Sequence, residues 1–254
     1  MRLSACVEWL FAAESDNFAD RIRLADRHGV EAVEFWKWTN KDIGSIEWAL
    51  TETGMELTSF VAEPMIALTD RANQEAFLKG LKSSIETARR LGAGTLIAQA
   101  GDDLPGKSRE EQKAALIETL AAAGEILEGS GVRLGLEPLN TVIDHVGYFL
   151  HSTVEGIEIV KATGRPEIGI VYDVYHSAVM GEETAEVIGG DIDRVFHVHV
   201  ADHPGRNEPG SGDIDLKRRV DWLVEHGYEG AIGLEYRPLA ASAATIAETR
   251  RMLS

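Results

Sequence analysis

The sequence predicts an α/β protein with a single (β/α)8 barrel, the TIM barrel fold, in which residues 1–254 form one domain. Amphipathic helical stretches alternate with short apolar runs along the chain, which indicates parallel strands connected by helices. Eight such runs occur in 254 residues, and this kind of barrel commonly has about 250 residues. No linker and no change in composition divides the chain, so all eight runs are expected to share one sheet.

The eight expected strands are five to seven residues long and mainly apolar, as is typical of strands whose outer face is covered by helices. They lie near residues 3–9, 31–36, 56–61, 94–99, 132–137, 168–173, 195–200 and 231–235. An open doubly wound sheet is the alternative arrangement. Its usual phosphate-binding loop, GxGxxG after the first strand, is absent, and "CVEWLFAAES" stands there instead.

The stretches between the strands carry apolar residues three and four positions apart, the spacing of a helix with one buried face. Phe18, Ile22 and Ala25 show this spacing in the first stretch, and Ile117 and Leu120 show it in the fourth. Glycine follows many stretches, as in "RLADRHG" and "ARRLG", because the residue after a helix often takes a left-handed conformation. Residues 240–252 supply the helix after the last strand.

Four consecutive strands of the expected barrel end in residues that commonly bind metals: Glu137, Asp173, His199 and Glu235. The carboxyl ends of the strands form the active face of such barrels. Side chains alternate along a strand, and these four have the opposite parity to the helix-facing residues, so they point toward the barrel axis. Three buried carboxylates and one imidazole need a compensating charge. The pattern therefore predicts one shared divalent cation.

The surroundings of these residues agree with a cation site. Gly135, Val171 and Gly233 stand two residues before the three carboxylates and are small enough to leave room. Three negative charges and one divalent cation leave a net negative charge, which Arg206 could offset. Carboxylate and imidazole donors favour Mn²⁺, Mg²⁺ or Co²⁺, with Zn²⁺ as a further candidate.

Other polar residues near the strand ends receive different interpretations. His197 shares the parity of His199 but lies one layer deeper, so we expect a structural role or a contact behind the metal ligands. His176 has left its strand and is expected to contact substrate rather than metal. Some residues at the ends of early strands could either line the pocket or take salt-bridged or core positions: Glu8, Glu34, Trp36 and Trp38.

At these residues the sequence resembles the hydroxypyruvate isomerase family, within the xylose isomerase-like barrels that also include ketose 3-epimerases. The resemblance covers essentially the whole chain and is carried by "VEFWKWTNKD", "LGLEPLNTVIDHVGYFL", "YDVYHS", "HVHVADHPGRNEPGSGDID" and "GLEYRP". It implies one divalent metal bound by Glu137, Asp173, His199 and Glu235, with Glu137 and Glu235 as the catalytic acid and base. It also implies a substrate-binding set: His176, Arg206, Asn207, Glu208 and His145.

The activity that the resemblance implies is the movement of a proton next to a carbonyl through an enediolate. The expected substrate is a small α-hydroxycarbonyl compound, of the hydroxypyruvate or 2-oxo-tetronate type. A ketose 3-epimerase is the alternative, since it performs similar chemistry on the same barrel. Two departures bear on the substrate: His199 stands where these isomerases can carry Gln, and Asn207 stands where members often carry His.

Two further function classes fit the predicted barrel less well. A multi-zinc phosphodiesterase acting on damaged DNA needs additional ligands from earlier strands, whereas only His28 precedes residue 145 among the histidines. A non-catalytic sugar-binding barrel would keep Arg206 but need not keep paired glutamates. The expected number of metal ions per chain differs among these classes: one for the isomerase or epimerase, about three for the nuclease and none for the binder.

Composition limits the expected partners. The formal charge is −17, from 42 acidic and 25 basic residues, and it disfavours binding to nucleic acid and to anionic membranes. The single cysteine, Cys6, cannot form an internal disulfide and suggests a reducing compartment. No apolar run reaches the length of about 18 residues that a membrane-spanning helix needs. We therefore expect a cytoplasmic protein, and the resemblance is compatible with a homo-oligomer.

Overall fold

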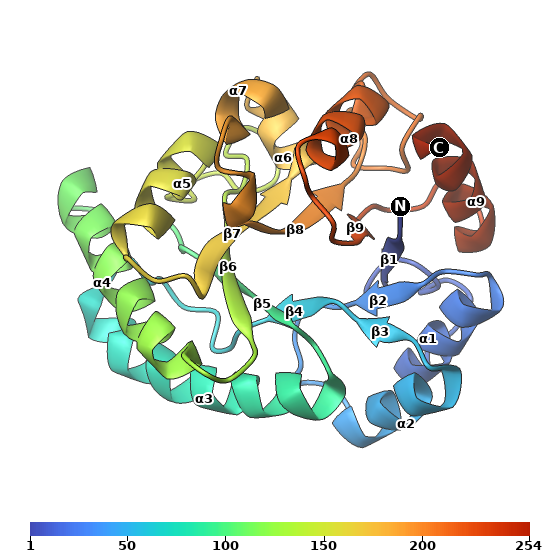
Figure 1. The fold of residues 1–254 in the computed structure, drawn as a ribbon, viewed down its shortest axis with the longest axis horizontal. Helices are drawn as coiled ribbons and strands as arrows, with labels where there is room; N and C mark the ends of the chain where they lie inside the picture. Colours follow the sequence, from blue (N-terminus) through green and yellow to red (C-terminus); the bar gives the residue numbers. More distant parts are fainter.

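The computed structural model describes residues 1–254 and confirms the predicted barrel fold. Parallel strands surround a central axis and helices cover their outer side (Figure 1). Neighbouring strands follow the order β3-β2-β1-β9-β8-β7-β6-β5-β4. The strands are β1 (Leu3–Cys6), β2 (Ala32–Glu34), β3 (Glu56–Leu57), β4 (Ser59–Val61), β5 (Thr95–Gln99), β6 (Arg133–Glu137), β7 (Ile168–Asp173), β8 (Val195–Val200) and β9 (Ile232–Leu234).

Most helices begin and end where local sequence signals place them. Asn17, Asp42 and Ser152 each accept a hydrogen bond from a backbone N–H of the first helical turn, as N-cap residues do. Gly54 and Gly92 end two helices with positive φ angles of 71° and 78°. The helices are α1 (Phe18–Arg27), α2 (Ile43–Thr53), α3 (Gln74–Leu91), α4 (Arg109–Leu127), α5 (Thr153–Ala162), α6 (Val174–Val179), α7 (Thr184–Ile188), α8 (Leu216–Glu225) and α9 (Ser242–Leu253), with 3-10 turns η1 (Arg71–Asn73) and η2 (Ile192–Arg194).

The third expected strand, 56–61, is divided in two. β3 pairs with β2, and β4 pairs with β5, so the sheet changes partners at Thr58. The Thr58 hydroxyl turns into the barrel, where it lies 2.9 Å from Ser4 Oγ and donates to Glu34 Oε2 at 3.2 Å. The division therefore replaces one continuous strand by two short pieces at the same position in the barrel wall.

The connection after β7 also differs from the expected single helix. Asp173 ends β7 and caps α6 at once, because its Oδ1 accepts from the backbone N–H groups of Tyr175 and His176. This helix ends after six residues, near Gly181, whose φ is +77°, and α7 follows. A strand-end carboxylate is thus also a helix cap, which fixes its direction.

The first and last strands of the barrel pair with each other, and β1 lies between β2 and β9 (Figure 1). Leu3, Ser4 and Ala5 are in register with Ile232, Gly233 and Leu234. An apolar core fills the space between the barrel and the helices, whereas Val61, Ile97 and Val171 form a small separate cluster inside. No helix combines the length and hydropathy that crossing a bilayer requires.

The barrel interior has no room for an extra methyl group at Gly135. A Cβ atom there would lie 2.7 Å from Val171 Cγ2, so we predict that Gly135→Ala overpacks the interior and lowers the free energy of unfolding by about 1–3 kcal/mol. Urea denaturation measures this change. Gly190→Ala is the matched control, since a Cβ atom at Gly190 meets nothing within 4 Å. Equal stability of the two variants would contradict the packing argument.

Candidate active site

The structure brings together the four side chains expected at the barrel axis. Glu137 ends β6, Asp173 ends β7, His199 lies in β8 and Glu235 directly follows β9. One potential ligand atom from each residue lies within 4.8 Å of all the others, and all four side chains are buried. They come from four adjacent strands, and Asp173 and His199 are direct partners in the β7–β8 pairing. The backbone of the barrel therefore defines the cluster.

His199 occupies the centre of this cluster. Its Nδ1 lies 3.0 Å from Glu137 Oε1 and 3.9 Å from Glu235 Oε2, and its Nε2 lies 3.1 Å from Glu34 Oε1 on the other side. Gly233 faces the same ring, where a Cβ atom would lie 2.6 Å from His199 Cδ2 and from Glu34 Oε1. Glycine is therefore required at position 233 for the imidazole and the Glu34 carboxylate to meet.

Arg206 brings a cation to the rim of the cluster. One of its guanidinium nitrogens lies 2.5 Å from Glu235 Oε2 and 3.6 Å from Asp173 Oδ2. Its guanidinium carbon lies 5.0 Å from the ring centre of Trp9 and 5.2 Å from that of Tyr175, so two aromatic faces hold the group. The offset of negative charge by Arg206, suggested by the sequence, is present in this arrangement.

The loop that carries Arg206 is organised around one buried carboxylate. Asp202 accepts hydrogen bonds from the backbone N–H groups of His203, Gly210 and Ile214 at 2.8, 2.9 and 3.0 Å. Arg206 itself has a φ of +55°, a conformation that residues with a side chain rarely adopt. The loop is therefore held in a defined shape that places the guanidinium over the strand ends.

Burial and neighbouring charges change the pKa values of the cluster in opposite directions. Burial raises the pKa of the Glu137 and Asp173 carboxyl groups. Burial also acts to raise the pKa of Glu235, but the charges of His199 and Arg206 outweigh it and lower that pKa. For His199, burial acts to lower the pKa, but Glu235 and Glu34 outweigh it and raise the pKa well above its usual value.

These observations show that the cluster fits a divalent cation. Without a cation, its carboxylates are balanced by His199 and Arg206 and by the raised pKa values of Glu137 and Asp173. Carboxylate oxygens and one imidazole are suitable ligands for a hard or borderline divalent ion. In addition, Nε2 of the buried His176 has no hydrogen-bond partner and lies 3.5 Å from Asp173 Oδ2. An imidazole nitrogen without a hydrogen-bond partner therefore lies beside the four potential ligands.

A cavity of about 490 Å³ opens above the cluster at the carboxyl ends of the strands. Glu137 and Glu235 line it, together with His145, His176 and Arg206 from the expected substrate-binding set. The rings of His145 and His176 lie 5.3 Å apart. Nδ1 of His176 accepts from the backbone N–H of Asn140 at 3.2 Å, so Nε2 is the ring nitrogen left without a hydrogen-bond partner.

Asn207 and Glu208 do not line this cavity. The Asn207 amide donates to the Arg237 carbonyl at 2.7 Å, and Glu208 Oε2 accepts from the Leu239 backbone N–H at 3.0 Å. Both side chains therefore form hydrogen bonds between the loop after β8 and the segment after β9. They were expected to bind substrate because they lie in a loop motif, and a direct contact with substrate stays a prediction.

Several cavity residues were missed or left open by sequence reasoning. Gln99 ends β5 beside Glu137, and applying the strand-end rule to earlier strands would have found it. Trp36, one of the open alternatives, lines the cavity and donates from its indole to Glu235 Oε1 at 2.7 Å. Lys37 and Arg237 also line the cavity, but they lie on loops, where no periodic pattern marks them.

The structure also distinguishes between the alternative roles of the other residues at the ends of the early strands. Glu8 both lines the cavity and forms a salt bridge to Lys41 at 2.6 Å. Trp38 lies outside the cavity, and its indole donates to Ser84 Oγ at 3.1 Å. Glu34 is a core residue beneath the cluster, where it contacts both histidines of β8.

Comparisons with known proteins agree with this fold and arrangement. A family model described as a xylose isomerase-like TIM barrel matches residues 22–254. The chain is 30% identical over 246 residues to hydroxypyruvate isomerase from Escherichia coli K12, with 94% of each chain covered. It is 30% identical over 237 residues to 2-oxo-tetronate isomerase from Cupriavidus necator, with 89% of this chain and 90% of that protein covered.

Among solved structures, a protein from Brucella melitensis described as an AP endonuclease of family 2 superposes with a TM-score of 0.91. It is 26% identical, and 98% of each chain is covered. The matched family model and the relatives at 30% identity each span most of the chain. The chain therefore belongs to the xylose isomerase-like TIM barrel family and, within it, to the hydroxypyruvate isomerase family.

Proposed function

We propose that this chain is a metal-dependent isomerase that moves a proton next to the carbonyl of a small α-hydroxycarbonyl acid. The convergence of Glu137, Asp173, His199 and Glu235 beneath an open cavity is the observation that carries the proposal. The names of the relatives, hydroxypyruvate isomerase and 2-oxo-tetronate isomerase, support the reaction type and the substrate class. Mn²⁺, Mg²⁺ or Co²⁺ is the proposed cofactor, with Zn²⁺ as the alternative.

The two glutamates perform the proton transfer in this proposal. Glu137 and Glu235 approach His199 Nδ1 from β6 and from the end of β9, so substrate bound between them can present a C–H bond to either carboxylate. A divalent cation held by Glu137, Asp173, His199 and Glu235 would supply Lewis-acid polarisation of the substrate carbonyl, which would ease loss of the neighbouring C–H proton. One carboxylate takes the proton from carbon, and one of the two returns it. Return to the neighbouring carbon gives isomerisation.

The cavity also has basic side chains that suit an acidic substrate. Lys37, Arg206 and Arg237 line it alongside four acidic residues, and the guanidinium of Arg237 lies 5.1 Å from the ring centre of Trp9. Guanidinium groups bind carboxylates with directed hydrogen bonds. A short 2-oxo acid would therefore place its carboxylate toward this side and its carbonyl toward the four buried residues.

A multi-zinc nuclease activity has less support, although one similar structure is described as an AP endonuclease. The cavity residues contributed by or near β1, β2 and β5 include Glu8, Trp36 and Gln99 but no histidine. The charge of −17 also disfavours a phosphate backbone as substrate.

Deuterium exchange in D₂O tests the proposal across a panel of short keto acids and ketoses. We expect deuterium incorporation next to the carbonyl of hydroxypyruvate or a 2-oxo-tetronate. Incorporation with transfer to the neighbouring carbon identifies an isomerase, whereas inversion at a ketose carbon identifies the 3-epimerase alternative. No exchange with any member of the panel, by protein that contains metal, would refute both activities.

Loss of either carboxylate should abolish most of the turnover. We predict that Glu137→Gln and Glu235→Gln each reduce kcat by about 10²–10⁴-fold, because the amide cannot accept the substrate proton. Glu118→Gln is the control, since Glu118 pairs with Arg71 on the exposed side of α4. Circular dichroism checks that the variants fold. A folded Glu235→Gln protein with wild-type turnover would contradict the assignment.

Removal of the metal should affect both turnover and stability. We predict that exhaustive chelation abolishes deuterium exchange and that Mn²⁺ restores it. At 100 times its dissociation constant, a cation that binds only the folded protein adds about 2.7 kcal/mol to the free energy of unfolding. Metal analysis and denaturation measure these effects, and one metal ion per chain is expected. Full activity of metal-free protein would exclude the metal-dependent mechanism.

A further inference from the structure

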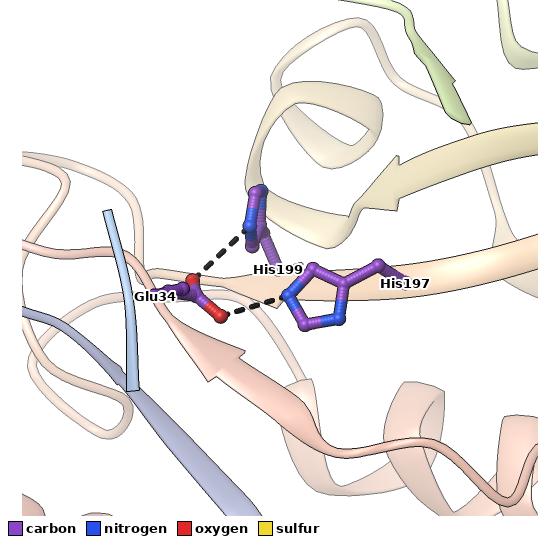
Figure 2. Close-up of side chains that lie close together, drawn as sticks. All are labelled: Glu34, His197 and His199. Carbon is purple, nitrogen blue, oxygen red and sulfur yellow. Dashed lines mark hydrogen bonds and ion pairs between the residues drawn. The ribbon is translucent and has the colours of Figure 1, made fainter. Parts of the chain in front are cut away.

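A buried cluster of one carboxylate and two imidazoles lies beneath the proposed metal centre: Glu34, His197 and His199 (Figure 2). We infer that Glu34, held in place by His197, is a positioning residue that fixes the ring of His199 so that Nδ1 faces the metal centre. The inference rests on the proposed metal-dependent function. It gives a role to two residues, Glu34 and His197, that do not line the cavity.

Each oxygen of the Glu34 carboxylate faces a different histidine. Oε2 lies 2.8 Å from His197 Nε2, in a hydrogen bond, and Oε1 lies 3.1 Å from His199 Nε2. Figure 2 shows the carboxylate between the two rings, with one contact to each. The rings are nearly perpendicular, at 89°, with their centres 4.8 Å apart. One carboxylate therefore sets the orientation of both imidazoles.

The contacts of His199 identify which nitrogen is available to a cation. Nε2 lies 3.1 Å from Glu34 Oε1 as a charge contact, and this buried oxygen has no hydrogen-bond partner, so a small rotation of the ring would let an N–H at Nε2 donate to it. Nδ1 faces Glu137 Oε1 at 3.0 Å and Glu235 Oε2 at 3.9 Å, within the group of potential ligands. A hydrogen at Nε2 leaves the lone pair on Nδ1 for a metal. Metal-binding histidines commonly direct their other N–H to a carboxylate in this way.

Glu34 reaches His199 across the barrel rather than from a neighbouring strand. It ends β2, which is separated from β8 in the sheet by β1 and β9. Gly233 of β9 lacks the side chain that would block this path, since a Cβ atom there would lie 2.6 Å from Glu34 Oε1. Two features of the barrel interior, a buried carboxylate and a glycine, are thus arranged around one imidazole.

A purely structural role explains the cluster less well. The side chains of Glu34, His197 and His199 are only 3–4% exposed. Burying such charged and polar groups is unfavourable, and well-packed apolar residues often stabilise a core better than a buried ion pair. The same barrel interior uses Val61 and Ile97 elsewhere. The unfavourable free energy of burying these groups is therefore best explained by a role in orienting His199 as a metal ligand.

Calorimetric titration of the metal-free full chain with Mn²⁺ tests the inference. We expect Glu34→Gln to weaken Mn²⁺ binding by about 10–100-fold, since the amide cannot accept from both imidazoles. His197→Phe keeps a ring but removes the donor to Glu34, so we expect a loss of about tenfold. Ser84→Ala is the matched control. It removes a buried hydroxyl that accepts from the Trp38 indole and that contacts neither Glu34 nor the histidines, and its affinity should stay within twofold.

A second measurement reports the ring of His199 directly. In ¹⁵N-labelled protein loaded with Zn²⁺, we expect His199 to bind through Nδ1, with its Nε2 proton shifted downfield by Glu34. In Glu34→Gln that proton should move upfield, whereas in Ser84→Ala it should not. A role in folding alone would change the stability of the variants but not these two readouts.

The outcomes separate this inference from the proposed function. Wild-type protein that binds no divalent cation would overturn both. Wild-type protein that binds Mn²⁺, together with a folded Glu34→Gln protein of equal affinity, would overturn only the positioning role. Should Glu34→Gln fail to fold, His197→Phe decides the question, and affinity within twofold of wild type in that variant would equally overturn the role.

Discussion

The need to balance charge inside the barrel determines much of this structure. Carboxylates from β2, β6, β7 and the end of β9 enter one small volume, and each would be unfavourable there by itself. His199 contacts three of them, Glu34, Glu137 and Glu235, through its two ring nitrogens. Arg206 balances the rim from above. The His199 imidazole therefore connects Glu34, deeper in the barrel, with the carboxylates at the carboxyl ends of the strands.

The need to balance charge also explains which residues lie on strands and which lie on loops. The four potential ligands lie on or directly after strands, where register fixes their distances. Other charged residues that line the cavity, such as Lys37 and Arg237, lie on loops. The loop after β8 combines both properties, because Asp202 gives it a fixed shape while Arg206 reaches the cavity. Functional residues on strand ends and on the loops that follow them are typical of barrel enzymes.

Sequence reasoning predicted the barrel and the convergence of its last strands because both depend on short-range patterns. Alternation along a strand was enough to place Glu137 and His199 on the same side, and the glycine signals marked helix ends such as Gly92. The sequence could not show that 56–61 divides, since that depends on how Thr58 turns into the barrel. It also left Glu34 ambiguous, because its partners lie on β8, far away in the chain.

The pairing of β1 with β9 has a consequence for the order of folding. β9 directly precedes Glu235 and pairs with β1, so a chain in which β9 has not yet docked lacks both this part of the barrel wall and one member of the acidic cluster. Contacts between residues so distant in the chain form slowly. Assembly of the four side chains at the barrel axis is consequently expected among the last steps of folding.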